Sequence, residues 1–129
     1  MQTGQLTERQ QKNAQRLYAM RFGALYPAWL AKTEGKGRSK AELDQVLCWI
    51  TGHTPESLAA EIAGDTNVET FFANAPGLNP ARELVTGMVC GVRVEEVEHP
   101  TMRVLRQVDK MVDELAKGWG MERVLRGVV

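Results

Sequence analysis

The chain has 129 residues, of which 43% are hydrophobic and 25% charged, and this length is enough to bury the core of one domain. Its 16 basic residues are matched by 16 acidic ones, and this balance disfavours a protein whose main task is to hold a phosphate backbone. No apolar run is long enough to span a bilayer, and residues 1–15 lack the apolar stretch of a secretory signal. We therefore expect one cytoplasmic domain over residues 1–129, with residues 1–12 as a flexible N-terminus and no membrane partner.

The first predicted helix begins near Glu8, because Thr7 and Gln10 have the spacing of a capping box. Pro27 cannot lie in a helix interior without the loss of a hydrogen bond and a clash with the preceding turn. It therefore predicts either a kink or the first position of a second helix. Residues 34–40 place two glycines among charged and polar residues, which predicts a loop.

A second capping box, formed by Ser39 and Glu42, predicts the start of the next helix. Its apolar residues recur with the spacing of a buried helix face: Leu43, Val46, Leu47 and Ile50. Gly52 has the position of a left-handed cap at the end of this helix. Thr54 and Pro55 then predict the cap and the first position of a following helix, which ends near residue 64.

A short helix is predicted behind Thr66 and Glu69, which have the spacing of a third capping box. Residues 74–79 contain a Pro-Gly pair and predict a tight connector. At the end of this connector, Asn79 and Pro80 again have the residue types of a cap and a first helical position.

The rest of the chain is expected to pack around residues 79–117. This stretch predicts an apolar helix, a corner marked by Gly91, and the longest amphipathic helix of the chain, which begins at Pro100. The apolar residues of the first helix are Ala81, Leu84, Val85 and Met88, and those of the last are Val104, Val108, Met111 and Leu115. Residues 91–98 fit both a short extended segment and a helical turn, and a short amphipathic helix follows Gly118.

Signals for strands are nearly absent, since no segment alternates apolar and polar residues and no Asn-Gly or Asp-Gly pair separates β-branched runs. We therefore predict an all-α fold, a compact bundle of six to eight short helices. Residues 50–58 and 89–97 share one pattern, in which a glycine lies between apolar residues and is followed by a glutamate. This pattern predicts two corners like those of helix-turn-helix units, and a structural corner is the better interpretation than DNA recognition.

Four stretches resemble one bacterial family that is known only as a domain of unknown function (family twenty-two hundred). They read YPAWLAKTEGKGRSKAELDQVLCWITG, ETFFANAPGLNP, TGMVCGVRVEEVEHPTM and DKMVDELAKG. The resemblance extends from about Leu17 to about Arg126 and implies a small cytosolic bacterial protein without an assigned reaction. Members of the family tend to have an aromatic residue where His53 stands and an aspartate where His99 stands, which counts against a mechanism that uses either histidine.

Residues for catalysis or for a metal are not evident. Zinc would have a suitable set of ligand types in Cys48, His53, Cys90 and His99, but their spacing fits no zinc-finger pattern. Both cysteines lie among apolar residues, which predicts buried thiols and disfavours a nucleophile or a disulfide. We therefore predict no cofactor, no metal and no catalytic residue, and an enzyme is the less favoured class.

Two groups of basic residues are candidates to bind an anion or a nucleic acid. The first lies in the loop before a predicted helix and the second on one face of the long helix: Lys36, Arg38, Lys40; Arg103, Arg106, Lys110. A solvent-exposed loop and an exposed helix face, balanced by nearby acidic residues, explain the same pattern and are favoured.

A pocket for a small molecule is a further candidate, near Phe72, Asn74 and Arg93. In this hypothesis the aromatic ring lines the pocket and the amide and guanidinium bind polar groups of the ligand. The favoured interpretation is simpler, because phenylalanines at helical spacing usually belong to the core.

Three classes of function stay open, in this order. The first is a non-enzymatic binding or interaction module, such as a homodimer formed through the C-terminal residues Trp119, Met121 and Val124. The second is a helix-turn-helix regulator that uses residues 55–62 or 94–106. The third is a small-molecule-binding protein or enzyme with the pocket just described.

Overall fold

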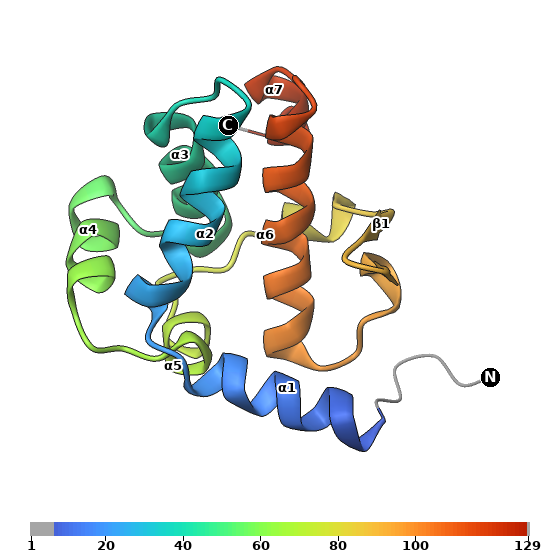
Figure 1. Ribbon diagram of the computed structural model, residues 1–129. Helices are drawn as coiled ribbons and strands as arrows, with labels where there is room; N and C mark the ends of the chain where they lie inside the picture. Colours follow the sequence, from blue (N-terminus) through green and yellow to red (C-terminus); the bar gives the residue numbers. More distant parts are fainter. Residues whose placement is uncertain (1–6, 129) are drawn as a thin grey trace.

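The computed structural model of the protein describes residues 7–128 and confirms the all-α prediction for them (Figure 1). Its helices are α1 (Glu8–Ala19), α2 (Phe22–Gly35), α3 (Lys40–Thr51), α4 (Pro55–Ala63), α5 (Val68–Ala73), α6 (Pro100–Ala116) and α7 (Met121–Val124). The remaining elements are two 3₁₀-helices, η1 (Pro80–Leu84) and η2 (Val94–Glu96), and two short strands, β1 (Met88–Val89) and β2 (Val92–Arg93). Of the N-terminal stretch 1–12, residues 8–12 belong to α1, and residues 1–6 lie outside the described residues.

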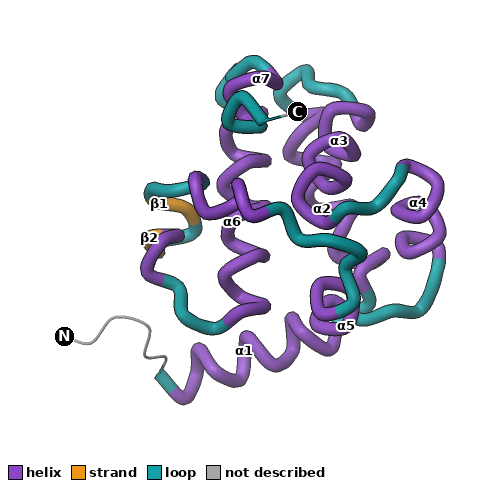
Figure 2. The backbone as a smooth tube through the Cα atoms, turned by 180° about the vertical axis from the view of Figure 1, so that it is seen from behind, coloured by secondary structure: helices purple, strands orange, loops and turns teal. Residues whose placement is uncertain are grey.

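Helix α6 runs through the middle of the molecule, and α2, α3, α5 and α7 pack against it (Figures 1 and 2). The predicted amphipathic helix behind Pro100 is thus confirmed, and its apolar face is fully buried: Val104, Leu105, Val108, Met111, Val112 and Leu115. Burial of each such side chain contributes about 1.5–3 kcal/mol, so this face forms the centre of the core.

Among the described helices, none is both long and apolar enough to cross a membrane.

Two connections between helices support each other. The backbone N–H of Phe22 donates to the carbonyl of Thr66 at 2.8 Å. The N–H of Val68 donates to the carbonyl of Met20, also at 2.8 Å. These N–H groups belong to the first residues of α2 and α5, where a helix lacks internal acceptors. The α1–α2 and α4–α5 connections are therefore fixed side by side, although Thr66 lies 44 positions after Phe22 in the sequence.

Pro27 lies inside α2, at its sixth residue, and the helix continues through it to Gly35. The alternative in which Pro27 begins a helix is therefore wrong. Its side chain is exposed, whereas Phe22, Tyr26 and Trp29 of the same helix are buried. The position is tolerated because the proline ring lies on the solvent side of a helix whose opposite face is firmly packed.

The corner after α3 follows the sequence closely. Gly52 has φ +82°, the predicted left-handed cap, and Thr54 caps α4. A side chain at position 52 would also meet the backbone of Gly77, because the connector of residues 74–79 crosses this point. The N–H groups of Gly77 and Asn79 donate to the last carbonyls of α3, at 3.0 and 3.1 Å.

The predicted apolar helix after Asn79 is wrong. Asn79 does cap the segment, through the N–H of Ala81, but only the five-residue helix η1 follows. Val85 and Val89 are buried, while Leu84 and Met88 are 58% and 52% exposed. Both pairs have a spacing of four, so apolar periodicity alone fits a helix here even though the chain forms a short hairpin instead.

The corner predicted at Gly91 is the turn of that hairpin and joins no helices. Strands β1 and β2 pair antiparallel, with Val89 opposite Val92, which leaves Cys90 and Gly91 as the two turn residues. Their φ angles are +51° and +77°, as a two-residue hairpin of the primed type requires. The sequence of residues 91–98 fitted both an extended segment and a helical turn. The structure contains both, since strand β2 is followed directly by the 3₁₀-helix η2.

The third capping box is also wrong, because the cap of α5 is Asn67. Its side chain accepts a hydrogen bond from the N–H of Thr70 at 2.8 Å. The hydroxyl of Thr66 donates instead to Glu61, likewise at 2.8 Å. Asparagine and threonine both suit an N-cap, so two adjacent candidates made the sequence ambiguous by one residue.

Candidate functional site

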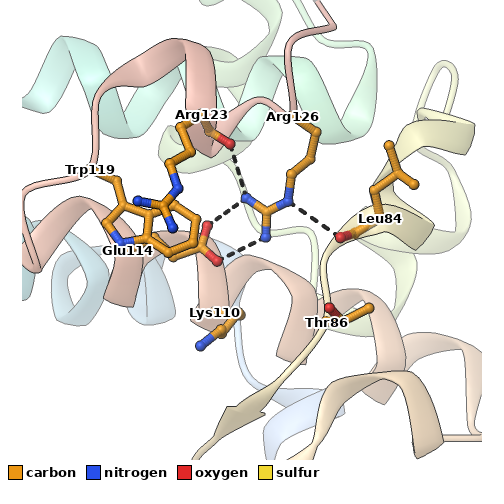
Figure 3. Close-up of a pocket in the computed structure, with 7 residues that line it drawn as sticks. All are labelled: Leu84, Thr86, Lys110, Glu114, Trp119, Arg123 and Arg126. Atoms are coloured by element: carbon orange, nitrogen blue, oxygen red, sulfur yellow. Dashed lines mark hydrogen bonds and ion pairs between the residues drawn. The ribbon is translucent and has the colours of Figure 1, made fainter.

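A pocket of about 440 Å³ opens between η1, α6 and the C-terminal segment (Figure 3). This volume lies within the range of sites for small molecules. The pocket is lined by residues from three separate parts of the chain: Leu84, Thr86, Lys110, Glu114, Trp119, Arg123 and Arg126. Three of these are basic and one is acidic, so the lining has a surplus of two positive charges.

The acidic residue, Glu114, is neutralised within the wall of the pocket. Its side chain is 1% exposed, and both of its oxygens accept hydrogen bonds from the guanidinium of Arg126, at 2.7 and 2.8 Å (Figure 3). The same guanidinium donates to the backbone carbonyls of Val124, Arg123 and Leu84, at 2.9, 3.3 and 3.4 Å. Arg126 therefore joins η1, α6 and α7, and its charge is not available to a ligand.

Trp119 and Arg123 form one wall of the pocket. The guanidinium carbon of Arg123 lies 3.6 Å from the centre of the indole ring, which is the geometry of a cation–π contact. The backbone of Trp119 is fixed from the other side, because Arg38 donates to its carbonyl at 2.6 Å and to that of Leu115 at 3.1 Å. The ring is therefore held in place before any ligand binds.

Lys110 and Arg123 carry the two charges of the pocket that no carboxylate of the described residues neutralises. Lys110 extends from α6, and its Nζ donates to the carbonyl of Met88 at 3.3 Å. Neither side chain forms an ion pair with any carboxylate in residues 7–128. Thr86, an exposed residue, adds a hydroxyl, and Leu84 adds an apolar rim. The arrangement is suited to an anion with an apolar part.

The six basic residues predicted from the sequence have different surroundings, and only Lys110 lines this pocket. In the loop, Lys36 is exposed, Arg38 pairs with Glu42, and Lys40 pairs with Asp44 at 2.7 Å. On α6, the guanidinium of Arg103 pairs with Glu83 and also donates to the carbonyls of Glu95 and Val97, while Arg106 pairs with Asp109 at 2.8 Å. Arg38 and Arg103 thus hold neighbouring segments together, whereas the ion pair of Arg106 lies within α6.

The pair of Arg38 and Glu42 makes the stability of the protein depend on pH. The guanidinium of Arg38 donates two hydrogen bonds to the carboxylate of Glu42, at 3.1 and 2.7 Å, and these bonds lower the pKa of Glu42 from 4.5 to about 2. The backbone N–H of Ser39 adds a third hydrogen bond at 3.0 Å. A carboxyl with a lowered pKa stabilises the fold above its unfolded pKa and loses that contribution as the pH falls toward its folded pKa.

We expect Glu42→Gln to lower the free energy of unfolding by about 1 kcal/mol at neutral pH, because glutamine keeps the capping geometry but loses the charge. The deficit relative to the unmodified protein should shrink between pH 4.5 and about 2, where Glu42 becomes protonated. Urea denaturation of both proteins at a series of pH values measures this difference in the free energy of unfolding. A deficit that stays constant down to pH 2 would show that the charge of Glu42 is not the cause.

The three residues of the predicted pocket lie apart. Phe72 is 3% exposed and packs edge to face on Phe71, with ring centres 4.9 Å apart. Asn74 is the exposed residue after α5, and Arg93 is an exposed residue of β2 beside Glu95 and Glu96. The hairpin and α5 are on opposite sides of α6 in both views of the molecule (Figures 1 and 2). The structure therefore does not bring these three side chains together.

The histidines have structural surroundings. His53 stacks on Phe71, with ring centres 5.3 Å apart, and its Nδ1 lies 2.8 Å from the hydroxyl of Ser57. His99 is the N-cap of α6 and lies 3.1 Å from the hydroxyl of Tyr18. An aromatic residue at position 53 would keep the stacking contact and an aspartate at position 99 would also cap α6, so both positions have structural roles that other residue types can fill.

The cysteines are separate and unpaired. Cys48 is half-buried in α3, and burial raises the pKa of its thiol. The prediction of a buried thiol is wrong for Cys90, which is exposed in the hairpin turn because its neighbours are not helical. No three residues of the types that bind metals come together in the described part of the chain.

The charges around α4 count against its use as a DNA-recognition helix. Residues 41–81, which include this helix, contain six acidic residues and no lysine or arginine. Binding to a duplex depends on basic side chains near the phosphates. In the alternative segment, residues 94–106, Arg103 and Arg106 are committed to the ion pairs described above.

The C-terminal segment packs on its own domain. Val124 and Leu125 are fully buried, and Trp119 and Met121 are half-buried against the core. The indole N–H of Trp49 donates to the carbonyl of Val128 at 2.6 Å, so α3 holds the end of the segment. A homodimer through this segment would use the outer sides of Trp119 and Met121, since Val124 is covered.

Two comparisons found related proteins. Residues 16–126 match a family described as uncharacterized protein conserved in bacteria (DUF2200). A crystal structure of uncharacterized protein SP1917 is 42% identical in sequence, covers 88% of this chain and 93% of its own, and has a TM-score of 0.83. A search of the curated proteins found no match.

Proposed function

The chain belongs to the DUF2200 family of conserved bacterial proteins, and from the geometry of its pocket we propose that it is a non-enzymatic binding module for a small anion. The ligand class is a carboxylate or phosphate that carries an apolar part. One observation carries this proposal: Lys110 and Arg123 face the same pocket without a carboxylate partner, while Arg126 neutralises Glu114. Two free thiols, Cys48 and Cys90, support a reducing, cytoplasmic location for the module.

The pocket offers a ligand both charge and surface. An anion between Lys110 and Arg123 would gain charge-assisted hydrogen bonds, each worth about 1.5–3 kcal/mol in proteins. The indole of Trp119 and the side chain of Leu84 offer apolar contact to the body of the ligand. Because Arg38 and Arg126 already fix the walls, the protein would lose little conformational entropy on binding.

We expect phenyl phosphate and benzoate, two probe anions that each carry an apolar ring, to raise the melting temperature of the protein, since a ligand that binds only the native state stabilises it. Each of the variants Lys110→Ala and Arg123→Ala should weaken binding by about tenfold, which corresponds to about 1.4 kcal/mol. Titration calorimetry measures the affinities, and sodium chloride at equal ionic strength controls for general salt effects.

Lys36→Ala is the matched control, because Lys36 is an exposed basic residue that does not line the pocket. It should bind both probes as well as the unmodified protein. The proposal fails if neither probe shifts the melting temperature. It also fails if the Lys36 variant loses as much affinity as the two pocket variants, since the effect would then come from net charge alone.

A further inference from the structure

Helix α1 carries a row of basic side chains on the face that is directed away from the rest of the molecule. Arg9, Lys12 and Arg16 follow one another at spacings of three and four, which places them along one side of a helix. At about 100° per residue, this side is opposite Ala14 and Tyr18, the buried residues of α1. The contacts that hold α1 on the core therefore leave the basic row free.

The charges of this row have few partners. Arg9 and Arg16 form no ion pair with any residue from 7 to 128. Lys12 lies 3.9 Å from Glu8, and the two side chains are 72% and 86% exposed. Exposed pairs of this kind contribute little, so the row presents nearly three full positive charges to the solvent.

The zero net charge of the chain conceals an uneven distribution. Residues 1–40 contain eight basic and two acidic residues, whereas residues 41–81 contain six acidic and no basic ones. The row on α1 belongs to the basic part. The balance of charge over the whole chain therefore does not argue against binding of a polyanion at this helix.

We propose that α1 binds the phosphate backbone of a nucleic-acid duplex through Arg9, Lys12 and Arg16. The three residues rise about 10 Å along the helix, and their long side chains extend to successive phosphates. Such contacts position a protein on a duplex without reading its sequence. Asn13 is exposed beside the row and adds an amide donor for a phosphate oxygen.

A polyanion suits this face better than the surface of a protein. Arg9, Lys12, Asn13 and Arg16 have no apolar side chain between them on this side of the helix, and interfaces between proteins need an apolar centre. The row is also independent of the pocket, because α1 and α7 lie at opposite ends of α6 (Figure 1). Failure of one proposal therefore leaves the other intact.

Fluorescence anisotropy with a short labelled DNA duplex, and with an RNA duplex of the same sequence, tests the proposal. Three phosphate contacts predict that the logarithm of the affinity for DNA falls with the logarithm of the salt concentration with a slope of about −2.7. The triple variant R9A/K12A/R16A should lose at least tenfold in affinity and most of this slope. Alanine favours helix, so circular dichroism should show that α1 is retained.

The control is the triple variant K36A/R93A/K117A, which removes the same charge from exposed sites outside α1. It should keep the affinity and the slope of the unmodified protein, and the DNA and RNA arms show which duplex is preferred. Equal losses in the two triple variants would overturn the proposal. Tighter binding to poly-glutamate than to either duplex would also overturn it and would indicate an acidic protein as the partner. The proposal is also overturned if the unmodified protein binds no duplex but self-associates, and if the α1 variant alone loses this self-association. The row would then bind the acidic surface of a second copy of the chain.

Discussion

Replacing Arg126 by alanine is expected to lower the free energy of unfolding by about 3–5 kcal/mol, which is the usual cost of leaving a buried charge without its partner. Glu114 is 1% exposed, and Arg126 supplies hydrogen bonds to both of its oxygens. The substitution also frees the carbonyls of Leu84 and Val124. Urea denaturation measures the loss, and Trp119 at the rim of the pocket supplies a fluorescence signal for the loosening of the C-terminal segment.

The double variant Glu114→Met with Arg126→Met serves as the control. It removes both charges and keeps much of the side-chain volume, so it should recover most of the stability that the single variant loses. Backbone strain does not confound the comparison, because the φ of +56° at position 126 is just as unfavourable for alanine or methionine as for arginine. A loss below about 1 kcal/mol in the single variant would mean that water reaches Glu114 and that the pair contributes as surface pairs do.

Most of the helices could be predicted because their signals are local. Thr7 and Ser39 begin capping boxes in the structure as they do in the sequence, and Pro100 stands at the first position of α6. The hairpin could not be predicted by the same means. Its turn places Cys90 at positive φ, which residue preferences do not anticipate, and only the burial of Val85 and Val89 against the core decides between hairpin and helix.

The pocket is harder to predict, because its walls come from segments that are far apart in the sequence. Lys110 was among the candidate residues, but nothing local to it indicates that Trp119 and Arg123 share its pocket. One signal was present. Glu114 lies at the edge of the apolar face of the amphipathic helix, three residues after Met111, and a carboxylate that becomes buried there requires a basic partner. The identity of that partner, Arg126, depends on the turn after α7 and therefore on tertiary structure.

The second large effect is expected at Gly23, where α2 crosses α4. A Cβ atom at this position would lie 2.0 Å from the carbonyl oxygen of Ile62 and 3.1 Å from the carbonyl carbon. These are backbone atoms near the end of α4, so relief requires that one whole helix move away from the other. We expect Gly23→Ala to lower the free energy of unfolding by about 3 kcal/mol or more, beyond the range of an ordinary surface substitution.

Gly35→Ala in the same helix is the matched control for Gly23→Ala. Gly35 is the last residue of α2, and a Cβ atom there meets no other atom within 4 Å. Alanine is up to about 1 kcal/mol more favourable than glycine in a helix, so this variant should be neutral or slightly more stable. The same substitution should therefore act with opposite signs at the two positions, as measured by urea denaturation. Equal effects at both would mean that helix propensity outweighs the contact between α2 and α4, and that the two helices separate without appreciable cost.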